Sequence, residues 1–183
     1  MIRKHLILGI LILLAATSSA QQDTTLVYKR LGYTRDPLRS NWSHVVERKE
    51  AIWVVSLYNR KALMEKITYE DQKLEVRKGP YVQYYENGNV ASEGNFDKGY
   101  PLGEWRFYYA NKQLAEKLNY YWGKLNGEFV SFFENGAVKS RGRYVMDKKT
   151  GVFRTYHQNG QLLSEEYYDE EGKVRDRKIG GEN

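Results

Sequence analysis

The chain has 183 residues, of which 41% are hydrophobic and 28% charged, and its formal net charge is +6. This length suits one domain, and the 14% of aromatic residues argues against a disordered chain, because buried rings offset the entropy of ordering. The absence of cysteine excludes a disulfide scaffold, a thiolate zinc site and a cysteine nucleophile.

Residues 1–20 have the pattern of a secretory signal peptide. Arg3 and Lys4 form a basic start that precedes an apolar run, and Ser18 and Ala20 fit the small-residue rule for cleavage. The apolar run is much shorter than the roughly 20 residues that a membrane-spanning helix needs, although an uncleaved anchor is an alternative. We therefore expect cleavage after Ala20, export to the periplasm, cell surface or medium, and no transmembrane segment in the mature chain.

The charges of the mature chain give no sign of a nucleic-acid partner. Cleavage removes two cations and no acid, so the formal net charge falls to +4. The remaining charges of both signs are interspersed, which is typical of a solvated surface. We therefore expect no binding of nucleic acid.

Residues 21–49 form a lead-in segment with a weak pattern. Leu26–Tyr28 and Val45–Glu47 are candidate strands, and Asp36-Pro37 marks a turn between them. The sequence predicts nothing more definite for this segment.

Residues 50–78 are a worn copy of the repeat that follows. The predicted strands are Ile52–Tyr58 and Leu63–Tyr69, with Arg60-Lys61 at the turn. A polar and less regular terminal repeat is what a stacked array needs as a cap.

Residues 79–174 consist of four tandem blocks of 24 residues, each of which begins with glycine. The ninth position of every block is Asn and the twelfth is aliphatic. The third position is always aromatic, in Tyr81, Trp105, Phe129 and Phe153. The sixth position is also aromatic, in Tyr84, Tyr108, Phe132 and Tyr156. The eighteenth position is aromatic in Phe96, Tyr120, Tyr144 and Tyr168.

Each block has the pattern of a β-hairpin. Asn-Gly between aromatic and β-branched residues predicts a two-residue type I′ turn, and three of the four blocks contain it. The second block has Asn111-Lys112, so we expect a strained or longer turn there. The connections between blocks carry Gly99, Gly123 and Asp147, which tolerate the left-handed conformation.

A two-residue turn fixes the expected register of the first block. Its predicted pairs are Gly79 with Phe96, Tyr81 with Gly94, Gln83 with Ser92 and Tyr85 with Val90. Because side chains alternate between the faces of a strand, Tyr81, Tyr85, Val90 and Phe96 should form one apolar face, with the Tyr81 ring flat over Gly94. A sheet of about ten such strands would expose this face unless it curls, packs against residues 21–50 or pairs with a second copy, so a homo-oligomer is one of the options.

The opposite face carries the candidate binding residues. Tyr84, Tyr108, Phe132 and Tyr156 form an aromatic ladder on it, and Arg106 and Arg154 can donate hydrogen bonds to a ligand beside these rings. The alternative is that the four rings only stabilise the sheet by packing across strands.

The chain has no recognisable catalytic centre. His44 stands alone, and His157 is expected to pack on the apolar side near Leu162. Glu86 and Glu134 occupy the same repeat position beside turns, which favours solvated acids over a catalytic pair. We therefore expect no enzymatic activity, no cofactor and no metal site, and read residues 175–183 as a polar, frayed and flexible tail.

The blocks follow the pattern GxWxxYYxNGxLxxxxxYxxGxxxG, which resembles the variant MORN repeat family of tandem bacterial hairpins. The resemblance covers about residues 50–174, and the segment before them is similar to the lead-in of exported members. It implies an all-β, elongated antiparallel meander that acts by binding, without a shared active site. Related MORN arrays are associated with lipid headgroups and protein scaffolding, and variant members are often labelled as antitoxins.

Three functions remain open from the sequence. The first is an exported, non-enzymatic module that binds a protein or an envelope component such as a glycan or lipid headgroup. The second is a cell-wall or glycan-binding module, since GEWRFYY looks somewhat like choline-binding-type repeats, although Trp does not recur in every block. The third is an antitoxin-like partner of a toxin, a role that the signal peptide disfavours.

Overall fold

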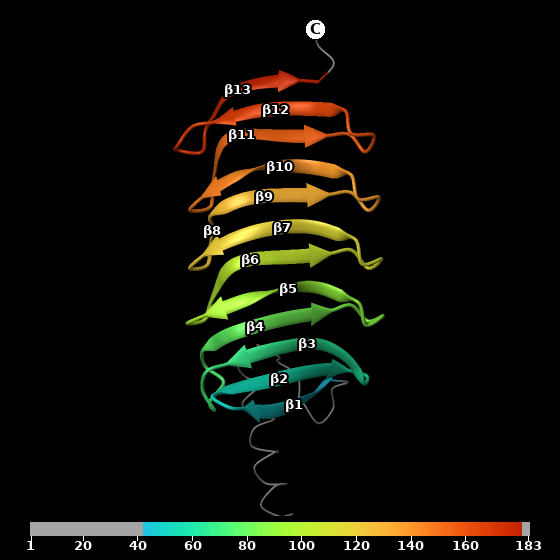
Figure 1. Ribbon diagram of the computed structural model, residues 1–183, viewed down its shortest axis with the longest axis vertical. Helices are drawn as coiled ribbons and strands as arrows, with labels where there is room; N and C mark the ends of the chain where they lie inside the picture. Colours follow the sequence, from blue (N-terminus) through green and yellow to red (C-terminus); the bar gives the residue numbers. More distant parts are fainter. Residues whose placement is uncertain (1–41, 181–183) are drawn as a thin grey trace, which may run out of the picture.

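The computed structural model describes residues 42–180, which form one antiparallel sheet of 13 strands (Figure 1). Each strand pairs with its neighbours in sequence, and the short β8 pairs with β7 beside the main path. The strands are β1 (Trp42–Lys49), β2 (Ile52–Asn59), β3 (Ala62–Tyr69), β4 (Arg77–Tyr84), β5 (Val90–Asp97), β6 (Tyr100–Tyr108), β7 (Leu114–Tyr121), β8 (Lys124–Leu125), β9 (Gly127–Phe132), β10 (Val138–Val145), β11 (Lys148–Tyr156), β12 (Leu162–Tyr168) and β13 (Val174–Ile179). The predicted elongated meander of tandem hairpins is confirmed.

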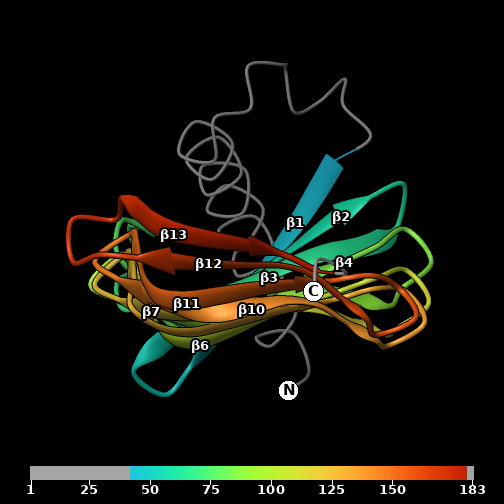
Figure 2. The ribbon, with the colours of Figure 1, turned by 90° about the horizontal axis from the view of Figure 1, so that it is seen from above.

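The sheet is a single twisted layer. Seen from above, the strands from β4 onward overlie one another in a thin band, whereas β1 and β2 are rotated away from it (Figure 2). This rotation is the accumulated twist that neighbouring strands impose on a long sheet. Among residues 42–180, no helix or second sheet covers either face.

The N-terminal part of the sheet follows the predicted strands of the worn copy. β2 and β3 form where Ile52–Tyr58 and Leu63–Tyr69 were expected, and Arg60 and Lys61 make the turn with φ of 48° and 74°. β1 covers the candidate strand Val45–Glu47. The signal peptide, Leu26–Tyr28 and Asp36-Pro37 lie outside the described residues.

The prediction of type I′ turns at Asn-Gly is wrong. In the first block, Tyr85 N–H donates to Asn89 O at 2.8 Å and Gly88 N–H donates to Tyr85 O at 2.9 Å. Only Gly88 has a positive φ, of 82°, so this is a three-residue loop made of a type I turn and a left-handed residue. The Asn87 side chain accepts from Asn89 N–H at 3.0 Å, which gives the ninth-position Asn a structural role.

A β-bulge compensates for the longer loop. Tyr84 pairs with Val90, but Gln83 pairs with Ser92, so Ala91 is the extra residue. Beyond the bulge the predicted pairs of the first block are confirmed, whereas the pairing of Tyr85 with Val90 is wrong. Val90 therefore lies on the face of Tyr84, and the same shift recurs in the other three blocks.

Within the four blocks, type I′ turns occur instead at the opposite ends of the strands. Two-residue turns with positive φ at both positions join β5 to β6, β7 to β8 and β10 to β11. They are formed by Lys98-Gly99, Trp122-Gly123 and Met146-Asp147. The expectation that Gly99, Gly123 and Asp147 adopt the left-handed conformation is confirmed.

One face of the sheet, which we call the ring face, carries the third- and eighteenth-position aromatic residues. These rings pack edge to face along the sheet, with centroids 5.1 Å apart between Phe96 and Trp105 and 5.4 Å apart between Tyr144 and Phe153. Trp105 and Phe153 are each only 6% exposed. A second cluster, formed by Val55, Leu57, Ile67, Tyr69 and Leu74, lies at the N-terminal end.

The glycines on the ring face make room for rings from the following strand. A Cβ at Gly94 would meet the ring of Trp105, and one at Gly142 would lie 2.5 Å from the ring of Phe153. The prediction that Tyr81 covers Gly94 is therefore wrong, because the covering ring comes from the next block. These contacts tie the first block to the second and the third block to the fourth.

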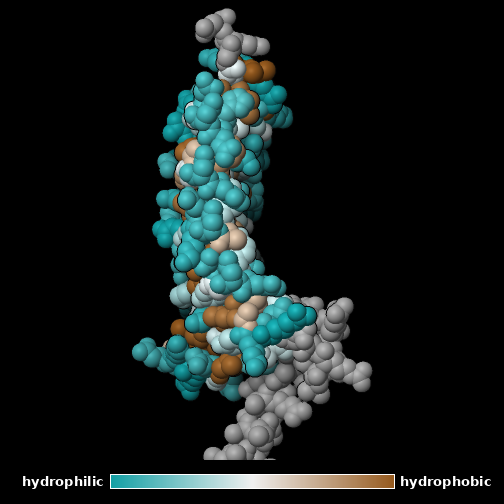
Figure 3. Space-filling model, turned by 90° about the vertical axis from the view of Figure 1, so that its right-hand side faces the viewer, coloured by the Kyte–Doolittle hydropathy of each residue, from teal (hydrophilic) through white to brown (hydrophobic). Residues whose placement is uncertain are grey.

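The side of the sheet on which the Asn-Gly turns lie, here called the Asn-Gly edge, is mostly hydrophilic. Viewed onto this edge, the sheet is a narrow column with separate hydrophobic patches (Figure 3). His157 lies at this edge and is exposed, with its N–H bonded to Gln161 O at 2.8 Å. The prediction that His157 packs on the apolar side near Leu162 is wrong, because the bulge moves Leu162 to the other face.

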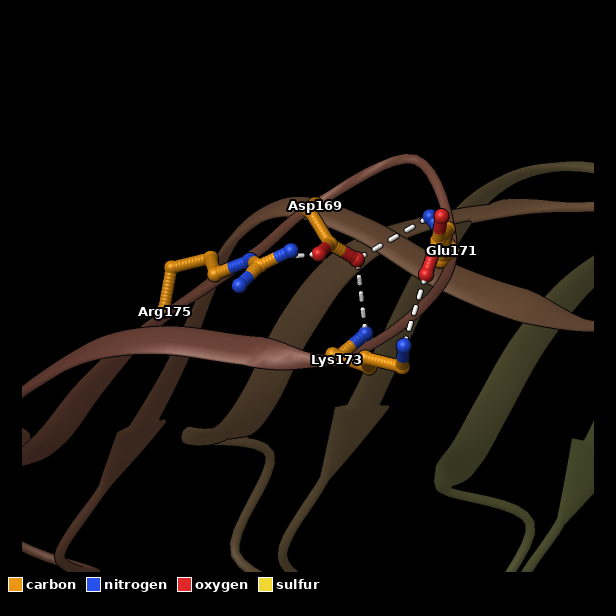
Figure 4. A network of polar contacts seen from close by, with 4 residues as sticks. All are labelled: Asp169, Glu171, Lys173 and Arg175. Atoms are coloured by element: carbon orange, nitrogen blue, oxygen red, sulfur yellow. Dashed lines mark hydrogen bonds and ion pairs between the residues drawn. The ribbon is translucent and has the colours of Figure 1, made fainter.

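The C-terminal end also differs from the frayed tail predicted for residues 175–183, because Val174–Ile179 forms β13 and pairs with β12. The carboxylate of Asp169 anchors this strand (Figure 4). It accepts from the N–H groups of Glu171 at 3.0 Å and Lys173 at 2.8 Å, and from Arg175 Nε at 2.5 Å. Residues 181–183 lie outside the described part.

Replacing Lys112 by Gly should stabilise the sheet. Lys112 has a φ of 73° at the position that holds glycine in the other three blocks, so it carries a conformational cost of about 1 kcal/mol. Lys112→Gly should raise the free energy of unfolding in urea by about that amount. Gly160→Lys, at the equivalent and sterically open position of the last block, should lower it by a similar amount. Equal effects of the same sign would contradict the turn assignment.

Removing the charge of Asp169 should loosen β13. The backbone N–H of Lys173 has the largest effect in lowering the pKa of this carboxyl below its usual value. The Arg175 side chain and the backbone N–H of Glu171 lower it further. The stabilisation of β13 by the Asp169 carboxylate should therefore be complete above about pH 4. It should be lost as the pH falls through the lowered pKa that this carboxyl has in the folded protein. At neutral pH, Asp169→Asn should speed amide hydrogen exchange in residues 174–179 roughly three- to tenfold.

The matched control for this measurement is Asp97→Asn, at a turn in the middle of the sheet. It should leave exchange in β13 unchanged. Unaltered exchange in Asp169→Asn would show that strand pairing alone holds β13.

Candidate functional site

The candidate site is the face opposite the ring face, which we call the ladder face. The structure brings all four sixth-position rings to it, in Tyr84, Tyr108, Phe132 and Tyr156. Because of the bulge, each ring pairs with the twelfth-position aliphatic residue of its own block. These partners are Val90, Leu114, Val138 and Leu162. Sequence reasoning placed them on the wrong face, because it assumed a two-residue turn.

The four ladder rings do not stabilise the sheet by packing on one another. Within residues 42–180, no two of them are in ring contact, and the ring-face aromatic residues make most of the ring pairs. Tyr108 Oη instead donates to Glu93 Oε1 at 2.6 Å, and the Arg141 guanidinium lies 5.7 Å from the centroid of Tyr156. All four rings are half-buried, so part of each is open to a partner.

A row of charged residues crosses the middle of the ladder face. Successive strand pairings connect Glu93 to Arg106, Arg106 to Lys117, Lys117 to Val130, Val130 to Arg141, Arg141 to Arg154 and Arg154 to Glu165. Sequence reasoning identified two members of this row, Arg106 and Arg154. It placed Lys117 and Arg141 on the same face as cross-strand neighbours but did not name them as binding residues.

The two predicted arginines already have carboxylate partners. Arg106 forms ion pairs with Glu93 at 3.5 Å and with Glu104, and Lys117 shares Glu104 at 2.9 Å. The hydrogen bond from Lys117, followed by the charge of Arg106, lowers the pKa of Glu104. Exposed pairs of this kind contribute little to stability, so these cations can exchange partners with a ligand.

Within residues 42–180, Arg154 is held by a single carboxylate. Its Nε donates to Glu165 Oε2 at 2.6 Å, and the two residues are cross-strand partners. On the other side of Arg154, the cross-strand partner is Arg141, which carries the same charge. The predicted binding arginines therefore lie in different surroundings, one in a network of acids and the other beside a second cation.

Exposed apolar side chains also gather on the ladder face. The pairing register places Tyr100, Tyr121, Val145, Val152, Leu162 and Tyr167 on it. Tyr100 is 56% exposed and Tyr167 is 50% exposed. Since the ring face packs its aromatic residues on one another, the ladder face has more apolar surface available to a partner.

Two shallow grooves lie on the ladder face. The smaller one has a volume of about 360 Å³ and is bounded by Val90, Glu93, Tyr108 and Lys112. The larger one, of about 830 Å³, extends from β7 to β11 and includes Lys117, Arg141 and Arg154. Shallow grooves on an extended face suit a macromolecular segment better than an enclosed small molecule.

The described residues contain no grouping suited to metal binding. No three His, Asp or Glu side chains of residues 42–180 come together as ligands. Glu86 and Glu134 are exposed residues of separate turns, as expected for solvated acids. No helix in the described part of the chain is long and apolar enough to cross a membrane.

The comparisons with known proteins agree with the repeat geometry. The family model described as MORN repeat variant matches residues 77–98, 101–120, 125–146 and 149–170. Each matched segment contains one Asn-Gly-type turn and its two flanking strands. No curated protein matches the chain.

Replacing Glu93 should lower the pKa of Tyr108. Burial raises this pKa above 10, and the hydrogen bond to Glu93 raises it further. In Glu93→Gln the pKa should therefore fall but remain above the usual tyrosine value, as measured by the ¹³Cζ shift of Tyr108 against pH. Glu86→Gln, at an exposed turn, should leave it unchanged. An unaltered pKa in Glu93→Gln would contradict the contact.

Proposed function

Because the chain belongs to the MORN repeat variant family, we propose that it is an exported, non-enzymatic binding or scaffold module. In this proposal its ladder face receives a protein or a component of the cell envelope. The observation that carries the proposal is the continuity of this face over four blocks, with a half-buried ring and an aliphatic partner in every block.

The difference between the two faces supports binding through the ladder face. The ring face packs its third- and eighteenth-position aromatic residues against one another and against glycines, and none of these rings is exposed. The ladder face combines exposed apolar side chains with a central row of cations. Apolar contacts provide affinity, and charges provide orientation and partner choice.

The signal-peptide pattern of residues 1–20 supports export. A chain cleaved after Ala20 would act outside the cytoplasm, where a protein without cysteine depends on strand pairing and ring packing for stability. The same pattern disfavours an antitoxin role, which requires the chain to meet its toxin in the cytoplasm. A glycan-binding role is less well supported, because the ladder rings alternate with aliphatic residues instead of forming aromatic cages.

Truncating the ladder rings should strongly weaken capture of the partner. The chain, expressed with its own leader and recovered from the envelope fraction, should begin at Gln21 and capture a partner from envelope extract. The variant Tyr84→Ala, Tyr108→Ala, Tyr156→Ala should lose at least about tenfold in capture, since rings at the centre of an interface dominate its energy.

The matched control replaces Glu86, Glu134 and Gln158, three exposed residues of the Asn-Gly turns, by Ala. This control should capture normally. Unchanged capture by a folded ring variant would rule out the ladder face as the binding surface, and recovery of the uncleaved chain from the cytoplasm would rule out export.

A further inference from the structure

We propose that the larger groove of the ladder face binds an extended acidic segment of a partner protein. The carboxylates of this segment would pair with a cluster of four cations, which we call the basic cluster, and its apolar side chains would contact the groove floor. The basic cluster consists of Lys117, Arg141, Arg143 and Arg154. This inference rests on the proposed function and names the chemistry of the partner.

The groove concentrates positive charge. Its lining contains the four members of the basic cluster and one acid, Glu128, which is the cross-strand partner of Arg143. Arg141 and Arg154 lie directly opposite each other on β10 and β11. Like charges in this arrangement are destabilising, so a bound anion would relieve a repulsion that the fold contains.

Two arginines of the basic cluster lack a carboxylate partner within the described part of the chain. Ion pairs within residues 42–180 engage Lys117 and Arg154, but none engages Arg141 or Arg143. Both side chains are exposed. The contact of Arg141 with the Tyr156 ring uses none of its five N–H donors, which remain available for bidentate recognition of a carboxylate.

The spacing of the cations fits an extended peptide. Lys117, Arg141 and Arg154 lie in one row across β7, β9, β10 and β11, and three strand spacings of about 4.8 Å separate its ends by about 14 Å. In an extended peptide, alternate residues are about 6.7 Å apart, so acids at three alternate positions span about 13 Å, close to the length of the row.

The floor of the groove favours a peptide over a polyphosphate or a glycan. Leu114, Val130 and Val152 line it and suit the aliphatic side chains of a peptide. A polyphosphate has no apolar surface to bury there. A sugar ring stacks best on a flat aromatic platform, but of the two aromatic residues of the lining only Phe132 lies on the ladder face, because Phe129 packs with the rings of the ring face.

The test measures binding of a fluorescein-labelled peptide with the core Glu-Val-Glu-Val-Glu to the mature chain by fluorescence anisotropy. The peptide should bind, and a Gln-Val-Gln-Val-Gln peptide should bind at least about tenfold more weakly. Arg141→Gln combined with Arg143→Gln should weaken binding of the acidic peptide by at least about tenfold. The matched control, Lys73→Gln with Lys124→Gln, removes the same charge outside the groove and should leave binding within about twofold.

Equal weakening by both double variants, with unchanged urea midpoints, would overturn the proposal, because it would indicate non-specific charge attraction. Competition by tripolyphosphate or oligogalacturonate at lower concentrations than the unlabelled peptide would overturn it in favour of a phosphate or glycan ligand. Failure of the acidic peptide to bind, while ring-dependent capture persists, would reject the groove proposal and leave the proposed function intact. Groove-dependent binding of the acidic peptide without ring-dependent capture would support the groove proposal and reject the ladder rings as the surface that captures the envelope partner.

Discussion

The packing of rings over glycines is the interaction on which the sheet depends. Residues 42–180 provide no second layer against which to bury the aromatic residues, so each ring is buried by its neighbours along the sheet. Trp105 lies over Gly94 and Phe153 lies over Gly142, in both cases across a boundary between blocks. Because a side chain at either glycine would collide with the ring, the small residue and the large one form a single packing unit.

The β-bulge beside each Asn-Gly turn decides which surface remains for binding. It rotates the twelfth-position aliphatic residue away from the ring face, so that this residue pairs with the sixth-position ring. The ring face keeps the aromatic residues that pack on one another, whereas the ladder face gains apolar side chains beside its charged row. The difference between the ring face, which packs aromatic residues, and the ladder face, which offers a binding surface, therefore follows from one extra residue per hairpin.

The sequence predicted the fold closely because the 24-residue period and the aromatic positions act locally. It failed where two turn types satisfy the same residues: Asn-Gly suits a two-residue loop and a three-residue loop equally well, and only the strand register distinguishes them. That error displaced Val90 and Leu162 and misplaced His157. β13 was missed because its stabilisation comes from pairing with β12 and from Asp169, not from its own polar sequence. The four ladder rings and the two arginines were placed correctly on one face, as was Arg141, but Arg143 emerged only from the pairing of β10 with its neighbours.

The order of the strands has a consequence for how the protein folds and how its length can change. Each strand contacts mainly the strands before and after it in the chain, so native contacts are close in sequence and contact order is low. Folding can then begin at any hairpin and spread outward, as in other one-dimensional arrays. Duplication or loss of one 24-residue block would preserve the antiparallel pairing between neighbouring strands, so the ladder face can lengthen to match its partner without a new fold.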